Sequence, residues 1–256
     1  MIHIKRSATP NCLLEDGISD GSLETERAKY HYTSGKSEDF DFVIYKNVKS
    51  ELKEMFSGKC AYCESKIEHV QYMHIEHYRP KGYVEGETKK SPGYYWLGSK
   101  WENLLLACEI CNGKEFKGNH FPLKDPKKRV KNHLGNIHQE EPLLINPCEE
   151  EHPEDHIIFK GDGEIEGVSL IGKQSIKHYG LFREDLRKAR ARYIYDLDLL
   201  LIALTGLIES YDNSKSTKAE EGIRKIIEKF QLNKDNDAQF AGLSRQYLHE
   251  KVYDFL

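Results

Sequence analysis

The chain has 256 residues, of which 38% are hydrophobic and 31% are charged, with 38 lysines and arginines against 42 aspartates and glutamates. This composition is polar for a globular protein but well short of that of a disordered one, and the length suits one large domain or two small ones. No apolar run approaches the ~20 residues that span a bilayer, so the sequence excludes a membrane protein. The basic first residues precede no apolar signal segment, which predicts a cytoplasmic location.

The first 58 residues are expected to combine irregular chain with helix. Residues 1–40 are polar and rich in turns, and they predict one short helix around residues 24–30. Residues 41–57 place apolar side chains at helical intervals, which predicts an amphipathic helix ending at Gly58.

Residues 59–131 contain two C-x-x-C motifs, Cys60-Ala-Tyr-Cys63 and Cys108-Glu-Ile-Cys111, with 44 residues between them. Clustered cysteines in a reducing compartment hold metal more often than they form disulfides. Two such knuckles complete a closed tetrahedral Zn²⁺ site, which is structural because no position is left for water or substrate. We therefore expect zinc here, and we expect Cys12 and Cys148 to be packing residues.

Charge is unevenly distributed along the chain. Residues 59–131 carry 14 lysines and arginines against 9 aspartates and glutamates, so this segment has a net charge of +5 and the remainder −9. A basic centre in an acidic chain favours a site that faces a polyanion, with ordinary charge unevenness as the alternative.

The second half predicts a connector followed by helices. Residues 132–172 read as extended pieces, with a β-hairpin over residues 157–168, and residues 173–256 read as helical. Within this region, helices are predicted over residues 175–211, 216–231 and 235–254. The first carries a basic run, Arg183 to Arg192, which is suited to nucleic acid or an acidic partner. Its apolar half, residues 197–208, is suited to packing in a helical bundle or to a subunit contact.

Four polar residues between and beside the knuckles resemble a known catalytic pattern. Glu76-His77, Asn103 and Asn112 fill the places of the carboxylate–histidine pair, the central asparagine and the helix-start ligand of the HNH endonucleases, in the ββα-metal group. The carboxylate here is Glu instead of the commoner Asp, and the last ligand is Asn instead of His.

Longer segments resemble one narrower family. The opening MIHIKRSATP, the IEHYRPK segment, Phe121-Pro122-Leu123 and LLINPCEEEHPEDHIIF are similar to the PtuB-like HNH nuclease subunit of Septu anti-phage defence, which also occurs as an effector of some retrons. This resemblance implies an α+β protein: a small ββα nuclease core at residues 59–131, braced by the four-cysteine zinc site, before an α-helical C-terminal region. It also implies an ABC-type, PtuA-like ATPase partner and, in retron systems, a reverse transcriptase and its DNA. The chain has no G-x-x-x-x-G-K-[ST] motif, so control by ATP would come from another subunit.

The resemblance also implies roles for the site residues. His77 would act as the general base, Glu76 and Asn112 would hold a catalytic Mg²⁺ or Mn²⁺, and Asn103 would tie the loop that orients His77. Four cationic side chains would either contact phosphates or lie solvated at the surface: Arg79, Lys81, Lys114 and Lys117.

Several residues nearby leave alternatives open. His74 is suited to a second ligand or phosphate contact, or to packing, whereas His69 and His120 are expected at the surface. Four aromatic residues are suited to stacking on bases, Tyr94, Tyr95, Trp96 and Trp101, and for the two tryptophans packing around the zinc core is the favoured alternative. The favoured function is DNA hydrolysis; the alternatives are an RNase acting on tRNA and a zinc-stabilised nucleic-acid-binding module without catalysis.

Overall fold

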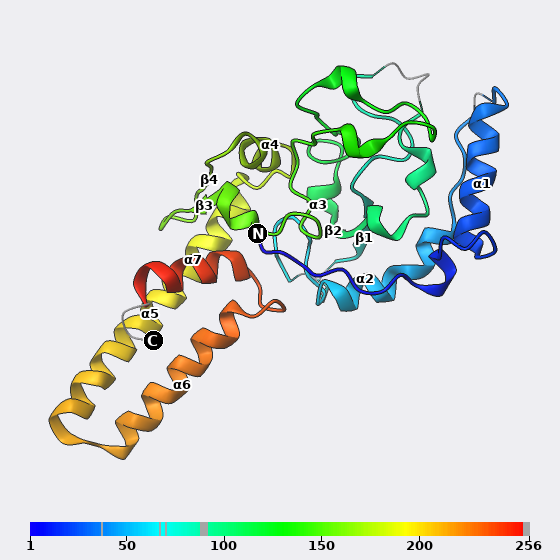
Figure 1. Ribbon diagram of the computed structural model, residues 1–256. Helices are drawn as coiled ribbons and strands as arrows, with labels where there is room; N and C mark the ends of the chain where they lie inside the picture. Colours follow the sequence, from blue (N-terminus) through cyan, green and yellow to red (C-terminus); the bar gives the residue numbers. More distant parts are fainter. Residues whose placement is uncertain (37, 67, 70, 88–91, 253–256) are drawn as a thin grey trace.

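A two-stranded antiparallel sheet lies at the centre of the first part of the chain in the computed structural model, which describes residues 1–36, 38–66, 68–69, 71–87 and 92–252 (Figure 1). Strand β1 (Met73–His77) pairs with β2 (Leu104–Cys108), which places Glu76 opposite Leu105 and His77 opposite Leu104. Strand β2 is buried throughout, in keeping with its run of apolar residues.

A short helix follows the sheet directly. Helix α3 (Glu109–Asn112) is capped by Cys108, whose Sγ accepts a hydrogen bond of 3.3 Å from the backbone N–H of Cys111. The order strand, strand, helix agrees with the ββα order expected for this segment.

The N-terminal region contains two helices. Helix α1 (Asp20–Thr33) is longer than predicted, because Ser19 caps it by accepting a hydrogen bond from the backbone N–H of Ser22. Helix α2 (Lys49–Met55) is shorter than the helix predicted over residues 41–57, and a 3₁₀ segment (Ile44–Val48) precedes it. The buried Glu24 carboxylate binds the backbone N–H groups of Val43 and Ile44, which holds this stretch out of an α-helix.

The predicted hairpin is confirmed as strands β3 (Ile157–Phe159) and β4 (Ile165–Gly167). The predicted helix over residues 175–211 is wrong, because it is two helices, α4 (Leu170–His178) and α5 (Glu184–Ser214). The break falls at Gly180, which has a φ of 62° and packs so closely on Phe116 that a Cβ would lie 2.5 Å from the ring.

Helix α5 and helix α6 (Thr217–Lys234) form a long hairpin that extends away from the rest of the molecule, and α7 (Ala241–Lys251) returns to it (Figure 1). The apolar half of α5 packs within this helical region on one face only: Leu197 and Leu204 are buried, whereas Leu199 and Ile202 are exposed. The predicted end of the last helix at residue 254 lies outside the described residues.

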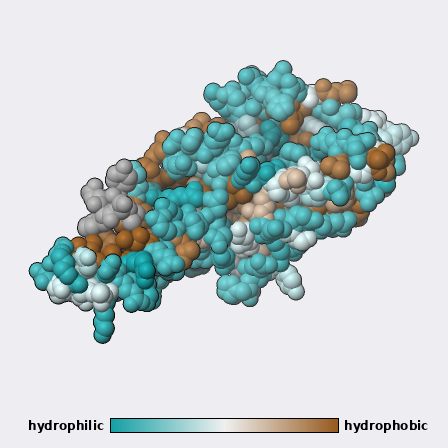
Figure 2. Space-filling model, turned by 60° about the horizontal axis from the view of Figure 1, so that its bottom comes forward, coloured by the Kyte–Doolittle hydropathy of each residue, from teal (hydrophilic) through white to brown (hydrophobic). Residues whose placement is uncertain are grey.

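The face of the molecule shown in Figure 2 is mostly hydrophilic, and one group of exposed hydrophobic side chains lies towards the end formed by the helical hairpin. No helix in the described part of the chain is long and apolar enough to cross a membrane.

The basic run of α5 binds the chain itself. Arg190 is buried, and its guanidinium donates to the carbonyls of Gly163 and Leu181 at 2.8 and 2.9 Å. Arg187 donates to the carbonyl of Asp162 at 2.9 Å. These two arginines therefore dock the turn of the β3–β4 hairpin onto α5.

Substitution of Gly163 is expected to weaken this docking. Gly163 has a φ of 81°, and an added Cβ would lie 2.2 Å from the carbonyl oxygen of Arg187. We expect Gly163→Ala to lower the free energy of unfolding by about 3 kcal/mol, measured by urea denaturation. The matched control is Gly161→Ala in the same turn, where a Cβ would meet nothing within 4 Å. Equal effects of the two substitutions would contradict the docking described here.

Candidate functional site

Four cysteines meet at the junction of the sheet with two other segments. The Sγ atoms of Cys60, Cys63, Cys108 and Cys111 lie within 4.8 Å of one another, and all four residues are buried. The first pair lies on the turn after α2, and the second pair lies at the end of β2 and in α3. Four converging sulfurs are the donor set that Zn²⁺ takes in structural sites, so the cluster can hold a structural metal ion such as zinc.

The arginine that caps the start of α5 contacts this cluster. Arg183 donates to the Sγ of Cys111 at 3.4 Å and to the carbonyl of Gly180 at 2.8 Å. A positive charge beside thiolates is favourable, and this contact joins α5 to the cluster. Cys12 and Cys148 lie outside the cluster and are partly buried, as expected of packing residues.

A polar cavity of about 400 Å³ lies beside the sheet. Four of the residues singled out from the sequence line it, namely Glu76, His77, Lys81 and Asn112. Asp39 and Asn119 also line it, and no motif in the sequence had marked them. The cavity therefore gathers residues from β1, the loop after it, α3 and the N-terminal region.

The Glu76 carboxylate has two partners that were not predicted. Its Oε1 lies 3.0 Å from the Nζ of Lys117 and accepts a hydrogen bond of 3.3 Å from the hydroxyl of Tyr62. Burial raises the pKa of the Glu76 carboxyl, and the Lys117 ammonium and the Tyr62 hydroxyl oppose that rise. Because Tyr62 lies within the first cysteine knuckle, Glu76 is anchored directly to the candidate metal cluster.

The His77 imidazole is buried and held in one orientation. Its Nε2 lies 2.8 Å from the carbonyl oxygen of Gly98, which can only accept, so Nε2 carries the proton and Nδ1 keeps its lone pair. Burial lowers the pKa of His77 to about 3, and the nearby charges of Lys81 and Lys117 contribute. His77 is therefore a neutral imidazole at physiological pH.

Asn103 ties the chain that follows His77. Its Oδ1 accepts from the backbone N–H of Arg79 at 2.7 Å, while its Nδ2 donates to the carbonyls of Arg79 and Leu97 at 2.9 and 3.2 Å. It does not line the cavity with His77, which agrees with a tie on the loop and not with a ligand.

The four predicted phosphate contacts are placed in three different environments. Lys81 is half-buried in the cavity wall, with its Nζ 4.8 Å from the ring centroid of Tyr45, and Lys114 is exposed. Arg79 and Lys117 differ from the expectation of surface contacts. Arg79 is buried in an ion pair with Glu140 at 3.3 Å, and Lys117 is fully buried against Glu76.

The other histidines and aromatic residues that were singled out from the sequence do not line the cavity. His74 and His69 are exposed and outside the cavity lining, and His120 is partly buried with its ring centroid 5.0 Å from that of His178. The packing alternative is confirmed for Trp96 and Trp101, which are buried, and Tyr94 and Tyr95 are buried as well.

Two residues that the sequence did not single out, Glu24 and Ser99, bond each other beside the backbone partner of His77. The buried Glu24 carboxylate accepts a hydrogen bond from the hydroxyl of Ser99, next to the Gly98 carbonyl that binds His77. Gly98 also leaves room for Phe42, because an added Cβ would lie 2.4 Å from that ring. Neither contact had a signal in the sequence, because Glu24 and Phe42 both lie far from residues 98 and 99 in the sequence.

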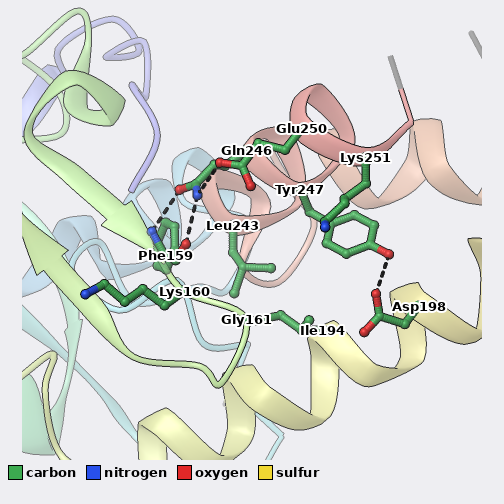
Figure 3. Close-up of a pocket in the computed structure, with 10 residues that line it drawn as sticks. All are labelled: Phe159, Lys160, Gly161, Ile194, Asp198, Leu243, Gln246, Tyr247, Glu250 and Lys251. Carbon is green, nitrogen blue, oxygen red and sulfur yellow. Dashed lines mark hydrogen bonds between the residues drawn. The ribbon is translucent and has the colours of Figure 1, made fainter. Parts of the chain in front are cut away.

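A second cavity, of about 290 Å³, lies between the hairpin turn, α5 and α7 (Figure 3). Its polar side chains bind one another or the backbone. Tyr247 donates to Asp198 at 2.7 Å, and the Gln246 amide bonds both the N–H and the carbonyl of Phe159 at 2.8 Å. These groups hold α7 against β3 and α5, so we do not regard this cavity as the candidate site.

The fold and site define a mixed α and β protein with a buried four-cysteine cluster, able to hold a structural metal ion, beside a polar cavity. The chain is 40% identical over 237 residues to Septu protein PtuB of Bacillus mycoides (strain KBAB4), which covers 90% of this chain and 79% of that protein. It is also 35% identical over 128 residues to Septu protein PtuB of Bacillus thuringiensis, covering 49% of this chain and 40% of that protein. The chain therefore belongs to the Septu PtuB family.

A relative with another name is also similar. Septu protein PtuA of Bacillus mycoides (strain KBAB4) is 27% identical over 207 residues, which is 78% of this chain but 26% of PtuA. No family model matches the chain.

Loss of a cluster cysteine is expected to unfold the region around it. Structural zinc contributes about 10–16 kcal/mol to folding in small zinc domains, which exceeds the net stability of most proteins. We expect Cys60→Ser and Cys111→Ser to lose the bound metal, measured by elemental analysis, and to lose the cooperative thermal transition. Cys148→Ser is the matched control and should keep both. Full metal content in either cluster variant would contradict a four-cysteine site.

The depressed pKa of His77 predicts a pH-dependent stability. An unfolded histidine titrates near 6.5, so below that pH the unfolded chain binds a proton that the folded chain does not. The contribution of the neutral His77 to the free energy of unfolding is fully present above pH 6.5 and is lost as the pH falls towards 3. Between pH 6.5 and 4.5 we expect wild type to lose about 2 kcal/mol more than His77→Gln, measured by urea denaturation. Identical pH profiles of the two proteins would count against the buried neutral imidazole.

Proposed function

We propose that the protein is a metal-dependent HNH endonuclease that hydrolyses phosphodiester bonds in nucleic acid, with DNA as the favoured substrate. One observation carries the proposal: Glu76, Asn112 and a neutral His77 with a free Nδ1 line the same cavity. Hydrolysis of a phosphodiester needs an activated water and neutralised charge on the phosphate, and these three side chains are suited to both requirements.

His77 activates the water in this proposal. Its Nδ1 accepts a proton from water, while the Nε2–H bond to the Gly98 carbonyl keeps the ring oriented. Asn103 holds the backbone just beyond His77 and thereby fixes the position of the base. Lys81, in the cavity wall, adds positive charge where a phosphate would lie.

Glu76 and Asn112 are the proposed holders of Mg²⁺ or Mn²⁺. A carboxylate oxygen and an amide oxygen facing one cavity are donors that both ions accept, so the residues present fit the group. The bound ion supplies Lewis acidity to the scissile phosphate and stabilises the charge that develops there. We expect products with 5′-phosphate and 3′-hydroxyl ends.

Membership of the Septu PtuB family supports a role in anti-phage defence and a PtuA-like partner. We propose that this partner is an ABC-type ATPase that licenses the nuclease. In a retron setting, the partners would include a reverse transcriptase and its DNA.

The test of this function is a cleavage assay with matched histidine variants. Purified protein is incubated with supercoiled plasmid, and separately with total tRNA, in Mn²⁺ or Mg²⁺, alone and with a co-expressed PtuA-like protein. We expect His77→Ala to lower the cleavage rate at least 10²-fold while keeping the fold and the zinc. His74→Ala, three residues away and exposed, should retain activity, and EDTA should abolish it.

The assay also distinguishes DNA from RNA as the substrate. Cleavage of tRNA but not of plasmid would replace DNA by RNA in the proposal. Absence of cleavage of both polymers, with the partner present, would leave a zinc-stabilised binding module instead of a nuclease. Activity in His77→Ala equal to that of wild type would remove the assigned base.

A further inference from the structure

Lys117 is a fully buried cation that the proposed reaction does not yet use. Its side chain has no exposed surface, and its Nζ lies 3.0 Å from the Oε1 of Glu76. The ammonium also lies 3.5 Å from the carbonyl oxygen of His77 and 3.4 Å from that of Gly118. A charge without access to water is costly to fold unless it is paired, so the contact with Glu76 is what makes this burial possible.

This ion pair changes the charge of the site. Glu76 is the buried carboxylate among the described residues that line the cavity, and it already has a cation on one oxygen. Lys81 adds a second ammonium in the cavity wall. A divalent ion that arrives at Glu76 therefore meets a carboxylate whose negative charge is already balanced, and it is repelled by the Lys117 ammonium if that group stays in place.

The surroundings of Lys117 give the ammonium other acceptors. Its three N–H donors face three oxygens: the Glu76 carboxylate and the two backbone carbonyls of His77 and Gly118. If the carboxylate is taken by a metal ion, the two carbonyls remain within reach, so the ammonium can leave Glu76 without crossing to solvent.

We propose that Lys117 and the catalytic divalent cation are alternative partners of Glu76, so that metal binding must open the Lys117–Glu76 ion pair. This inference rests on the proposed function, because it assumes that the metal binds at Glu76. Lys117 is then a residue that sets the metal affinity of the site: it holds Glu76 in the cavity before the metal arrives and lowers the affinity for the metal.

The experiment measures Mn²⁺ affinity directly, by electron paramagnetic resonance of the free ion, on the full chain with its zinc in place. We expect Lys117→Met and Lys117→Gln to bind Mn²⁺ about tenfold more tightly than wild type, because a competing charge has been removed. The matched control is Lys114→Met, which removes an exposed lysine three residues away and should leave the affinity within twofold of wild type. Glu76→Gln should lose this binding.

Each outcome separates the inference from the function on which it rests. The competition would be overturned by unchanged or weaker Mn²⁺ affinity in a Lys117 variant that keeps the zinc content and circular dichroism of wild type. In that case, Glu76-dependent binding in wild type would leave the proposed metal site intact. Absence of Glu76-dependent binding in wild type and variants alike would overturn the metal site and the inference with it. Lys117→Gln keeps an amide that can donate to Glu76, so it carries the test if Lys117→Met does not fold.

Discussion

The four-cysteine cluster is the constraint on which the rest of the structure depends. It joins three parts of the chain: the turn after α2, the end of β2 with α3, and Arg183, the residue that precedes α5. The sheet beside it has two strands of five residues, too little to fix a fold by itself. A metal bound by four sulfurs would hold these segments together. Tyr62, which lies between Cys60 and Cys63, links the cluster to Glu76 by its hydrogen bond to that carboxylate.

The cavity beside the cluster is held by polar groups that satisfy one another. Glu24 binds Ser99, the neighbouring Gly98 carbonyl binds His77, and Asn103 binds the backbone on both sides of Arg79. Buried networks of this kind are stabilising only when each member has its partner, and they then permit a single arrangement of the site. The network thus holds the His77 imidazole in one orientation.

The sequence predicts the local features well and the long-range partners poorly. The cysteine knuckles and the β3–β4 hairpin follow from spacing and turn chemistry within short segments, and the Glu76-His77 pair was singled out by a family resemblance. The break at Gly180 does not, because it depends on a phenyl ring from another segment. The burial of Lys117 is likewise set by a carboxylate 41 positions away, which no local pattern reports. Charged residues close in sequence to a candidate site can therefore be buried in the interior as easily as they can lie on its surface.

The placement of the two tryptophans allows two parts of the molecule to be observed separately. Both tryptophans, Trp96 and Trp101, are buried near the sheet, and the helices α4 to α7 contain none. Tryptophan fluorescence, excited selectively over that of tyrosine, therefore monitors the tertiary packing of the part that contains the β1–β2 sheet. The far-ultraviolet dichroism comes mostly from the helices, of which α5 and α6 are the longest. Coincident transitions of the two signals would mean that the hairpin and the half with the four-cysteine cluster unfold as one cooperative unit, and separated transitions would mean that the hairpin melts independently.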